Sequence, residues 1–152
     1  MKLHSISLTN KTIGLLGFGD LAKAHYPLML PFTKNISVYD PWIHNKIIKK
    51  AGFKSINLSK MFSDCEIIYV LATITTKNKN LIDKKLLNRM RSKSVVVLMI
   101  RAAIVNFEDI KKRIKKGDIY VAKDVFPEEP DKKNDTIRKL KKILFSDHRE
   151  GE

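Results

Sequence analysis

A glycine-rich turn is the first place in this sequence where chemistry is expected. Gly17, Gly19 and Ala22 have the spacing G-x-G-x-x-A, directly after an apolar run and before a segment with helical spacing. Gly17 would allow a tight turn, Gly19 would let a phosphate approach the backbone, and Ala22 would let helix and strand pack closely. The free N–H groups at a helix N-terminus attract phosphates. The residues predicted to contact a pyrophosphate are therefore Gly17, Phe18, Gly19, Asp20, Leu21 and Ala22.

An acidic residue about 20 positions further along the chain makes this interpretation more specific. Asp40 ends the next apolar run, where a carboxylate can accept hydrogen bonds from the ribose of an adenosine. A carboxylate there would repel a 2′-phosphate, so NAD is favoured over NADP. Simpler interpretations stay open: the two glycines can form a plain tight turn, Asp40 can cap a turn before Pro41, and Asp20 can be a helix N-cap.

The elements that must position these residues follow one another as apolar runs and helical segments. Strands are predicted at Ile13–Gly17, Ile36–Asp40, Glu66–Ala72, Ser94–Ile100, Ile119–Phe126 and Ile143–Ser146. Helices are predicted at Leu21–Leu30, Ile43–Ala51, Leu81–Met90 and Phe107–Lys116. Pro27 is expected to kink or shorten the first helix. Gly52 and Gly117 are expected to end the second and fourth.

The predicted strands are continuous apolar runs, which is typical of strands buried on both faces of a parallel sheet. Because strands alternate with helices, the sequence predicts an α/β fold, a Rossmann-type doubly wound parallel sheet with right-handed crossovers. The length of 152 residues suits a single domain spanning residues 1–152.

The composition of the chain argues against some classes of binding partner. The net charge is +14, but the excess is mostly lysine spread over predicted helix surfaces, without interleaved aromatics, so no nucleic acid is expected as partner. No apolar run approaches the roughly 18 residues of a membrane span, and the first residues do not look like a secretory leader. With Cys65 as the only cysteine, a cytoplasmic protein without membrane contact is expected. No metal site is predicted.

From about Leu8 to His148, the chain resembles the NAD-binding domain of the D-isomer-specific 2-hydroxyacid dehydrogenases. This family includes phosphoglycerate, glyoxylate/hydroxypyruvate and D-lactate dehydrogenases. The order and spacing of the matching pieces carry the resemblance: NKTIGLLGFGDLAK, SVYDPW, SDCEIIYVLA, NLIDKKLLNRM, IRAAIVNFEDI, KDVFPEEP and ILFSDHREGE.

The resemblance implies three catalytic residues, Arg101, Glu129 and His148. His148 would be the general base that removes the hydroxyl proton of a 2-hydroxy acid. Glu129 would orient its imidazole, and Arg101 would bind the substrate carboxylate. Without the resemblance, Arg101 would be interpreted as a surface ion-pair partner, Glu129 as part of an acidic turn, and His148 as part of a disordered chain end.

The resemblance also implies cofactor contacts for Asp124, Thr73 and Thr75. Some positions depart from the family pattern. Thr73 replaces a common proline, Asn78 stands where a second threonine is common, and Ala102 and Asp147 replace the usual glycine and proline beside the implied catalytic residues.

Family members also have a substrate-binding domain, which this sequence is expected to lack. Our first hypothesis is therefore the NAD-binding part of a truncated or split dehydrogenase for a small 2-hydroxy or 2-oxo acid, acting as a homodimer or with a separate substrate-domain chain. The alternative is a non-catalytic dinucleotide-binding module that serves as a sensor or interaction subunit. A basic nucleic-acid-binding module is the third, and it would bind DNA in a strongly salt-dependent way.

Overall fold

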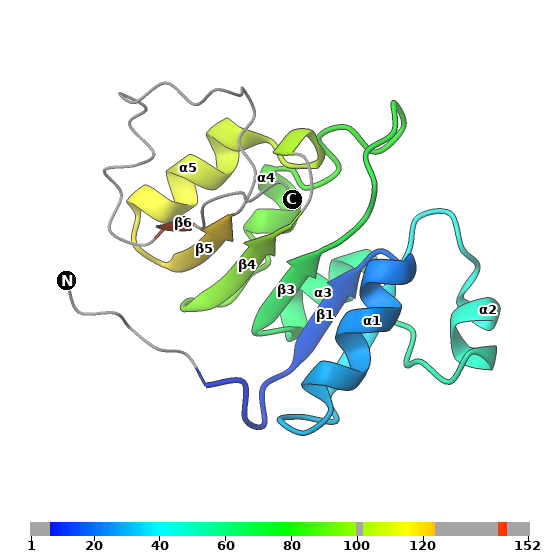
Figure 1. Cartoon of the computed structure of the whole chain (residues 1–152). Helices are drawn as coiled ribbons and strands as arrows, with labels where there is room; N and C mark the ends of the chain where they lie inside the picture. Colours follow the sequence, from blue (N-terminus) through cyan, green and yellow to red (C-terminus); the bar gives the residue numbers. More distant parts are fainter. Residues whose placement is uncertain (1–6, 100–101, 124–142, 146–152) are drawn as a thin grey trace, which may run out of the picture.

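A single parallel sheet organises the chain in the computed structural model, which describes residues 7–99, 102–123 and 143–145. Neighbouring strands follow the order β2-β1-β3-β4-β5-β6, and Figure 1 shows β1 beside β3 and β4 beside β5. All pairs are parallel. The strands are β1 (Ile13–Leu16), β2 (Ile36–Tyr39), β3 (Ile67–Val70), β4 (Ser94–Leu98), β5 (Ile119–Lys123) and β6 (Ile143–Phe145). The predicted doubly wound parallel sheet is confirmed.

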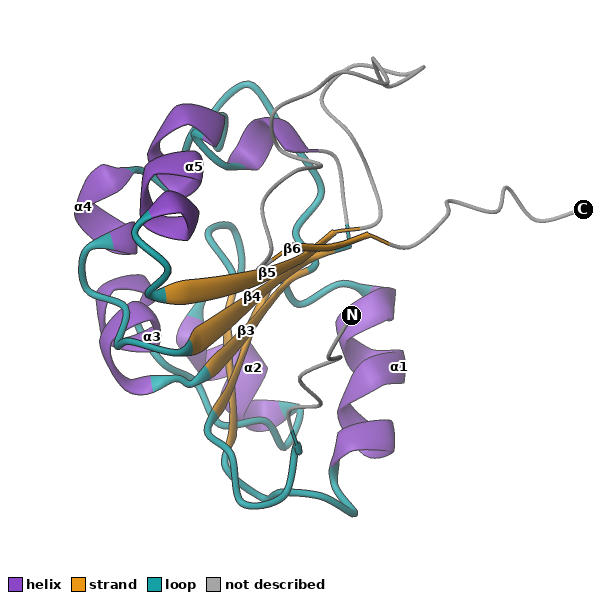
Figure 2. Cartoon of the chain, turned by 90° about the vertical axis from the view of Figure 1, so that its left-hand side faces the viewer, coloured by secondary structure: helices purple, strands orange, loops and turns teal. Residues whose placement is uncertain are grey.

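Helices cover both faces of this sheet. They are α1 (Asp20–Met29), α2 (Asn45–Lys50), α3 (Leu58–Asp64), α4 (Lys84–Leu87), α5 (Phe107–Lys115) and the short 3₁₀ helix η1 (Ala102–Ile104). Figure 2 shows α1 on one side of the sheet and α3, α4 and α5 on the other. Each side has its own apolar core, with Ala22 and Met29 of α1 in one and Met61 and Phe62 of α3 in the other. Within the described ranges, no helix is long and apolar enough to cross a membrane.

The strand register places the site-forming loops together. Ile13 of β1 is opposite both Ile36 of β2 and Ile67 of β3, and Ile67 is opposite Val95 of β4. The carboxyl ends of these strands therefore lie at one edge of the sheet. The chain leaves β1 towards β2 on one side and later returns to β3 on the other, which makes this edge the topological switch point where α/β sheets bind ligands.

Burial of the strands differs across the sheet. All four residues of β1 are buried, as the sequence pattern predicts. In β4 and β5, however, buried residues alternate with half-buried ones. The half-buried face includes Val95, Val97 and Tyr120. Continuous burial was therefore a correct prediction for β1 and a wrong one for these two strands, as far as the described residues show.

All four predicted helices differ from their predicted bounds, α1, α2 and α5 by one or two residues at an end and α4 by three residues at each end. α1 continues through Pro27 to Met29, so Pro27 does not end the helix; Met29 is only 4% exposed and anchors the last turn in the core. The helix predicted at Leu81–Met90 spans only Lys84–Leu87. Ile82 instead donates its N–H to the carbonyl of Ile104 at 3.0 Å. Asp83 then begins the helix by accepting the N–H of Leu86.

One helix was missed altogether. α3 begins after Asn57, whose Oδ1 accepts the N–H of Lys60 at 2.8 Å. An Asn followed by a short segment with apolar residues at Met61 and Phe62 is a helix-start signal in the sequence. The helix has only seven residues, too few for a clear periodic pattern.

Candidate functional site

A surface pocket lies at the carboxyl edge of β1, β2 and β3. It brings together the glycine turn, Asp40 and the loop after β3, three segments that are far apart in the sequence. Its lining residues are Gly17, Phe18, Gly19, Asp40, Trp42, Ile43, Leu71, Ala72, Thr73 and Thr75. Six of the predicted cofactor residues therefore meet in one place.

Gly17 is required by the fold itself. Its backbone has φ +115°, a conformation that residues with a side chain rarely adopt. A Cβ atom at this position would lie 2.7 Å from the backbone nitrogen of Ala72, at the end of β3. The Gly17 N–H also donates to the carbonyl of Tyr39 at 2.7 Å. The turn after β1 is thus held tightly between its two neighbouring strands.

Gly19 is not required by the fold in the same way. Its φ is −79°, which any residue can adopt, and a Cβ would meet no atom within 4 Å. It is the N-cap residue of α1 and provides no side-chain cap. Neither backbone conformation nor its described neighbours explain a glycine here. Open space beside a helix N-terminus is instead what a bound phosphate requires.

Asp40 is held in a fixed orientation by backbone donors. Its Oδ2 accepts the N–H of Phe18 at 2.8 Å, across the gap between the ends of β1 and β2. Its Oδ1 accepts the N–H groups of Trp42 at 2.7 Å and Ile43 at 3.0 Å. The interpretation of Asp40 as a turn cap is therefore correct. Because two carboxylate oxygens can accept about four hydrogen bonds, Asp40 still has capacity for a ligand hydroxyl.

Phe18 contributes to the site through its backbone N–H, which donates to Asp40, while its ring is buried. The ring is 5% exposed and contacts Phe53 edge-to-face with the ring centroids 5.0 Å apart. Ala22 is 1% exposed and lies where α1 packs on the sheet, as its small size predicts. These contacts fix the angle at which α1 leaves the turn.

Like Ala22, the predicted residues Asp20 and Leu21 do not line the pocket. Asp20 is the first residue of α1, with its carboxylate 3.7 Å from the ammonium of Lys23. The interpretation of Asp20 as the helix N-cap is wrong, because Gly19 occupies that position. Leu21 points partly to solvent and is 39% exposed.

The side chain of Asn78 holds the loop after β3 in place. In the sequence, Asn78 is notable only because it departs from the threonine that is common in the family. Asn78 is 1% exposed. Its Oδ1 accepts the N–H of Thr75 at 2.6 Å, and its Nδ2 donates to the carbonyl of Thr73 at 2.8 Å. Asn78 therefore fixes the backbone of the two threonines that were predicted to contact the cofactor.

Trp42 is a pocket residue that the sequence did not reveal. It follows Asp40 and Pro41, lines the pocket and is 53% exposed. The ammonium of Lys77, from the loop after β3, lies 5.7 Å from the centre of its ring, within cation–π range. The signal available in the sequence was a tryptophan two residues after a predicted site residue.

The remaining predicted residues, Arg101, Asp124, Glu129 and His148, lie outside the described residues. Arg101 follows β4 in the sequence, and Asp124 comes directly after β5. Both strands run parallel to β3, so their carboxyl ends lie on the same edge of the sheet as the pocket. The predicted roles of these four residues stay predictions.

Comparisons with known proteins agree with this geometry. The family model described as "D-isomer specific 2-hydroxyacid dehydrogenase, NAD binding domain" matches residues 1–149. The chain is 32% identical to the 2-hydroxyacid dehydrogenase-like protein YoaD of Bacillus subtilis over 155 aligned residues, covering 99% of this chain and 44% of the relative.

Solved structures show the same likeness. A phosphoglycerate oxidoreductase from Rhizobium etli is 29% identical with a TM-score of 0.85, over 97% of this chain and 47% of that one. An NAD-dependent formate dehydrogenase from Staphylococcus aureus, in complex with NAD, is 26% identical with a TM-score of 0.83, over 96% and 44%. The chain thus spans less than half the length of these proteins.

Proposed function

Because this chain belongs to the D-isomer specific 2-hydroxyacid dehydrogenase family through its NAD-binding domain, we propose that it binds NAD in the pocket between Gly17, Asp40 and Thr73. The observation that carries this proposal is Gly19, whose Cβ position is open while its φ is ordinary. The pyrophosphate of NAD, the cofactor of this family, would occupy that open space.

The pocket suggests how the two halves of the cofactor would lie. The pyrophosphate would lie against Gly19 at the N-terminus of α1, where backbone N–H groups and the helix dipole favour an anion. Asp40 would accept the hydroxyls of the adenosine ribose, with an orientation already fixed by Phe18 and Trp42. Trp42 and Lys77 would border the adenosine side of the pocket.

We further propose that the chain contributes this domain to an oxidoreductase acting on the CH–OH group of a small 2-hydroxy acid. When bound, the cofactor would supply an acceptor for the hydride that leaves the carbon bearing the hydroxyl. His148 would take the hydroxyl proton, oriented by Glu129. Arg101 would hold the substrate carboxylate with paired hydrogen bonds, and Asp124 would contact the nicotinamide end.

The whole enzyme would need partners for this reaction, because a substrate must be positioned and shielded from water. We propose either a homodimer or assembly with a separate substrate-domain chain, in the cytoplasm. Light scattering of the purified chain, with and without NADH, measures the mass of the assembly. A mass of one chain under both conditions would contradict the homodimer.

Calorimetric titration of the purified chain with NADH tests the cofactor proposal. We expect saturable binding, with NADPH bound more weakly because its 2′-phosphate would meet the carboxylate of Asp40. An absence of heat at millimolar NADH would refute NAD binding, and equal affinities would refute the role of Asp40.

A separate experiment tests the chemistry. In a preparation that oxidises a 2-hydroxy acid, His148→Ala should lower kcat by about 10²–10⁴-fold, while the affinity for NADH stays unchanged. Unchanged turnover would refute the role of His148. Tight NADH binding without turnover on any 2-hydroxy acid would favour the non-catalytic module instead.

A further inference from the structure

A second pocket lies at the opposite edge of the sheet, where β1, β3 and β4 begin. It is lined by Lys11, Glu66, Ile67, Arg91, Ser92, Lys93, Ser94 and Val95. The aligned starts of the three strands bring these residues together. Four-residue strands separate this pocket from the cofactor pocket by about 13 Å. Nothing in the cofactor proposal uses it.

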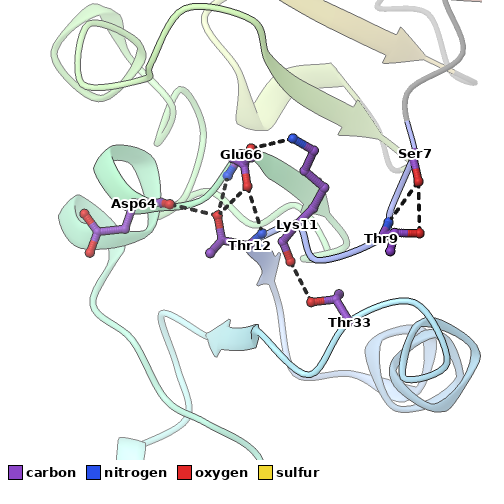
Figure 3. A network of polar contacts seen from close by, with 7 residues as sticks. All are labelled: Ser7, Thr9, Lys11, Thr12, Thr33, Asp64 and Glu66. Atoms are coloured by element: carbon purple, nitrogen blue, oxygen red, sulfur yellow. Dashed lines mark hydrogen bonds and ion pairs between the residues drawn. The ribbon is translucent and has the colours of Figure 1, made fainter.

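The lining of this pocket is positively charged. The lining contains three cations, Lys11, Arg91 and Lys93, and a single carboxylate, that of Glu66, which leaves two positive charges. Lys11 is the cation that Glu66 neutralises, with Nζ 2.7 Å from Oε1, as the dashed line in Figure 3 shows. Glu66 also accepts the N–H of Thr12 at 3.2 Å. Its oxygens are therefore turned towards β1.

The other two cations have no such partner. Arg91 and Lys93 are exposed, and neither side chain makes a hydrogen bond or ion pair within the part of the chain that the structure describes. They flank Ser92 on the turn that leads into β4. Two uncompensated cations on one tight turn repel each other and favour a shared anion.

Ser94 supplies the independent observation. It is 2% exposed and lines the pocket, yet its hydroxyl has no hydrogen-bond partner among the described residues. Buried hydroxyls are nearly always hydrogen-bonded, so an unpartnered one needs an explanation. The hydroxyl oxygen is itself fully buried, so the Ser94 side chain must rotate towards the pocket before a ligand oxygen can accept its proton.

We propose that this pocket is a second ligand site, which binds the phosphoryl group of a small molecule. Arg91 and Lys93 balance the two negative charges of a phosphate dianion, and Ser94 donates a hydrogen bond to one of its oxygens. The Lys11–Glu66 pair borders the site and holds its β1 side in place. Every described residue that lines the site belongs to this chain.

Inorganic phosphate is the probe for the first test, in an NMR titration of the full chain against chloride at matched ionic strength. We expect saturable shifts of the backbone amides from Ser92 to Val95. Arg91→Gln should weaken phosphate binding about tenfold or more, because a charge-assisted hydrogen bond is lost. Arg89→Gln is the matched control, since Arg89 is exposed, lies two residues away and is not part of the lining.

Ser94→Ala separates a ligand role from a structural one. Removal of an unpartnered buried hydroxyl should leave the melting temperature without phosphate unchanged or raised. The same substitution should weaken phosphate binding about tenfold. A merely structural serine would instead lower the melting temperature and leave the affinity for phosphate unchanged.

Three outcomes would overturn the proposal. The first is an absence of phosphate-specific shifts beyond those caused by chloride. The second is equal weakening by Arg91→Gln and Arg89→Gln, which would indicate a diffuse response to net charge. The third is tighter binding of acetate than of phosphate, which would assign the pocket to carboxylates.

Discussion

Gly17 and Gly19 belong to the same turn, and the structure predicts opposite consequences when each is replaced by alanine. Gly17→Ala should damage the fold, because its φ is +115° and its new Cβ would lie 2.7 Å from the backbone of Ala72. Gly19→Ala should leave the fold intact, because its φ is −79° and no atom lies within 4 Å of the new Cβ. The same methyl group would, however, occupy the space proposed for the pyrophosphate.

The magnitudes follow from these geometries. A non-glycine residue in a sparsely populated backbone region costs about 1–3 kcal/mol, and the contact with Ala72 adds to it. Gly17→Ala should therefore lower the free energy of unfolding by about 3 kcal/mol or more, a large part of a typical 5–15 kcal/mol. For Gly19→Ala, the small preference for glycine at an N-cap opposes the gain of about 0.4–1 kcal/mol from a less flexible unfolded chain.

Two measurements on both variants decide the matter. Urea unfolding gives the free energy of unfolding, and titration with NADH gives the affinity. We expect Gly19→Ala to unfold within about 1 kcal/mol of the wild type and to bind NADH at least tenfold more weakly. Wild-type affinity in Gly19→Ala would refute the placement of the pyrophosphate. Wild-type stability in Gly17→Ala would refute the account of the turn.

Three further predictions concern the side chains of Asn78, Glu66 and Cys65. Asn78→Ala removes two hydrogen bonds from a buried loop brace, so it should lower the free energy of unfolding by about 1–3 kcal/mol and weaken NADH binding; unchanged NADH affinity would show that the loop does not touch the cofactor. The hydrogen bond from Lys11 holds the pKa of Glu66 below its usual value. This contribution to stability is present above the unfolded pKa of about 4.3 and is lost as the pH falls through the lower folded pKa. In urea unfolding, the Glu66→Gln variant should therefore lose less stability than the wild type when the pH is lowered below about 4.3. Parallel plots of unfolding free energy against pH for the two proteins would contradict the pairing. Burial, followed by the carboxylate of Asp64, raises the pKa of Cys65 from 9.0 to about 11, so alkylation at pH 8 should be at least about a hundredfold slower in the folded chain than in urea; equal rates would show that the thiol is accessible.

The sequence predicted the sheet well because strands in a parallel sheet leave a strong local signal. Each observed strand lies within its predicted range, since a buried strand needs a run of apolar residues such as Ile67–Val70. Short helices are less visible. α4 keeps only four residues because Ile82 pairs with the distant Val105, a contact between segments that no local pattern contains.

A site residue was predictable from the sequence where the geometry of the fold requires one particular residue type at its position. Gly17 and Asp40 lie where the spacing placed them, because the turn and the strand ends are fixed by the fold. The fixed orientation of Asp40 was not predictable, since it depends on a bond to Phe18 across two strands. Asn78 and Trp42 were missed for the same reason. Their roles come from neighbours that only the tertiary structure brings close.

The place of β1 between β2 and β3 has a consequence for synthesis on the ribosome. Both strands that flank β1 are translated after it, and the backbone that supports Gly17 belongs to Ala72, 55 positions later. At about 5–20 residues per second, the nascent turn waits roughly 3–11 s for that support. During this interval β1 can pair only with β2, and its edge towards β3 stays unpaired. The turn that is proposed to hold the cofactor is therefore completed only after the end of β3 has been translated.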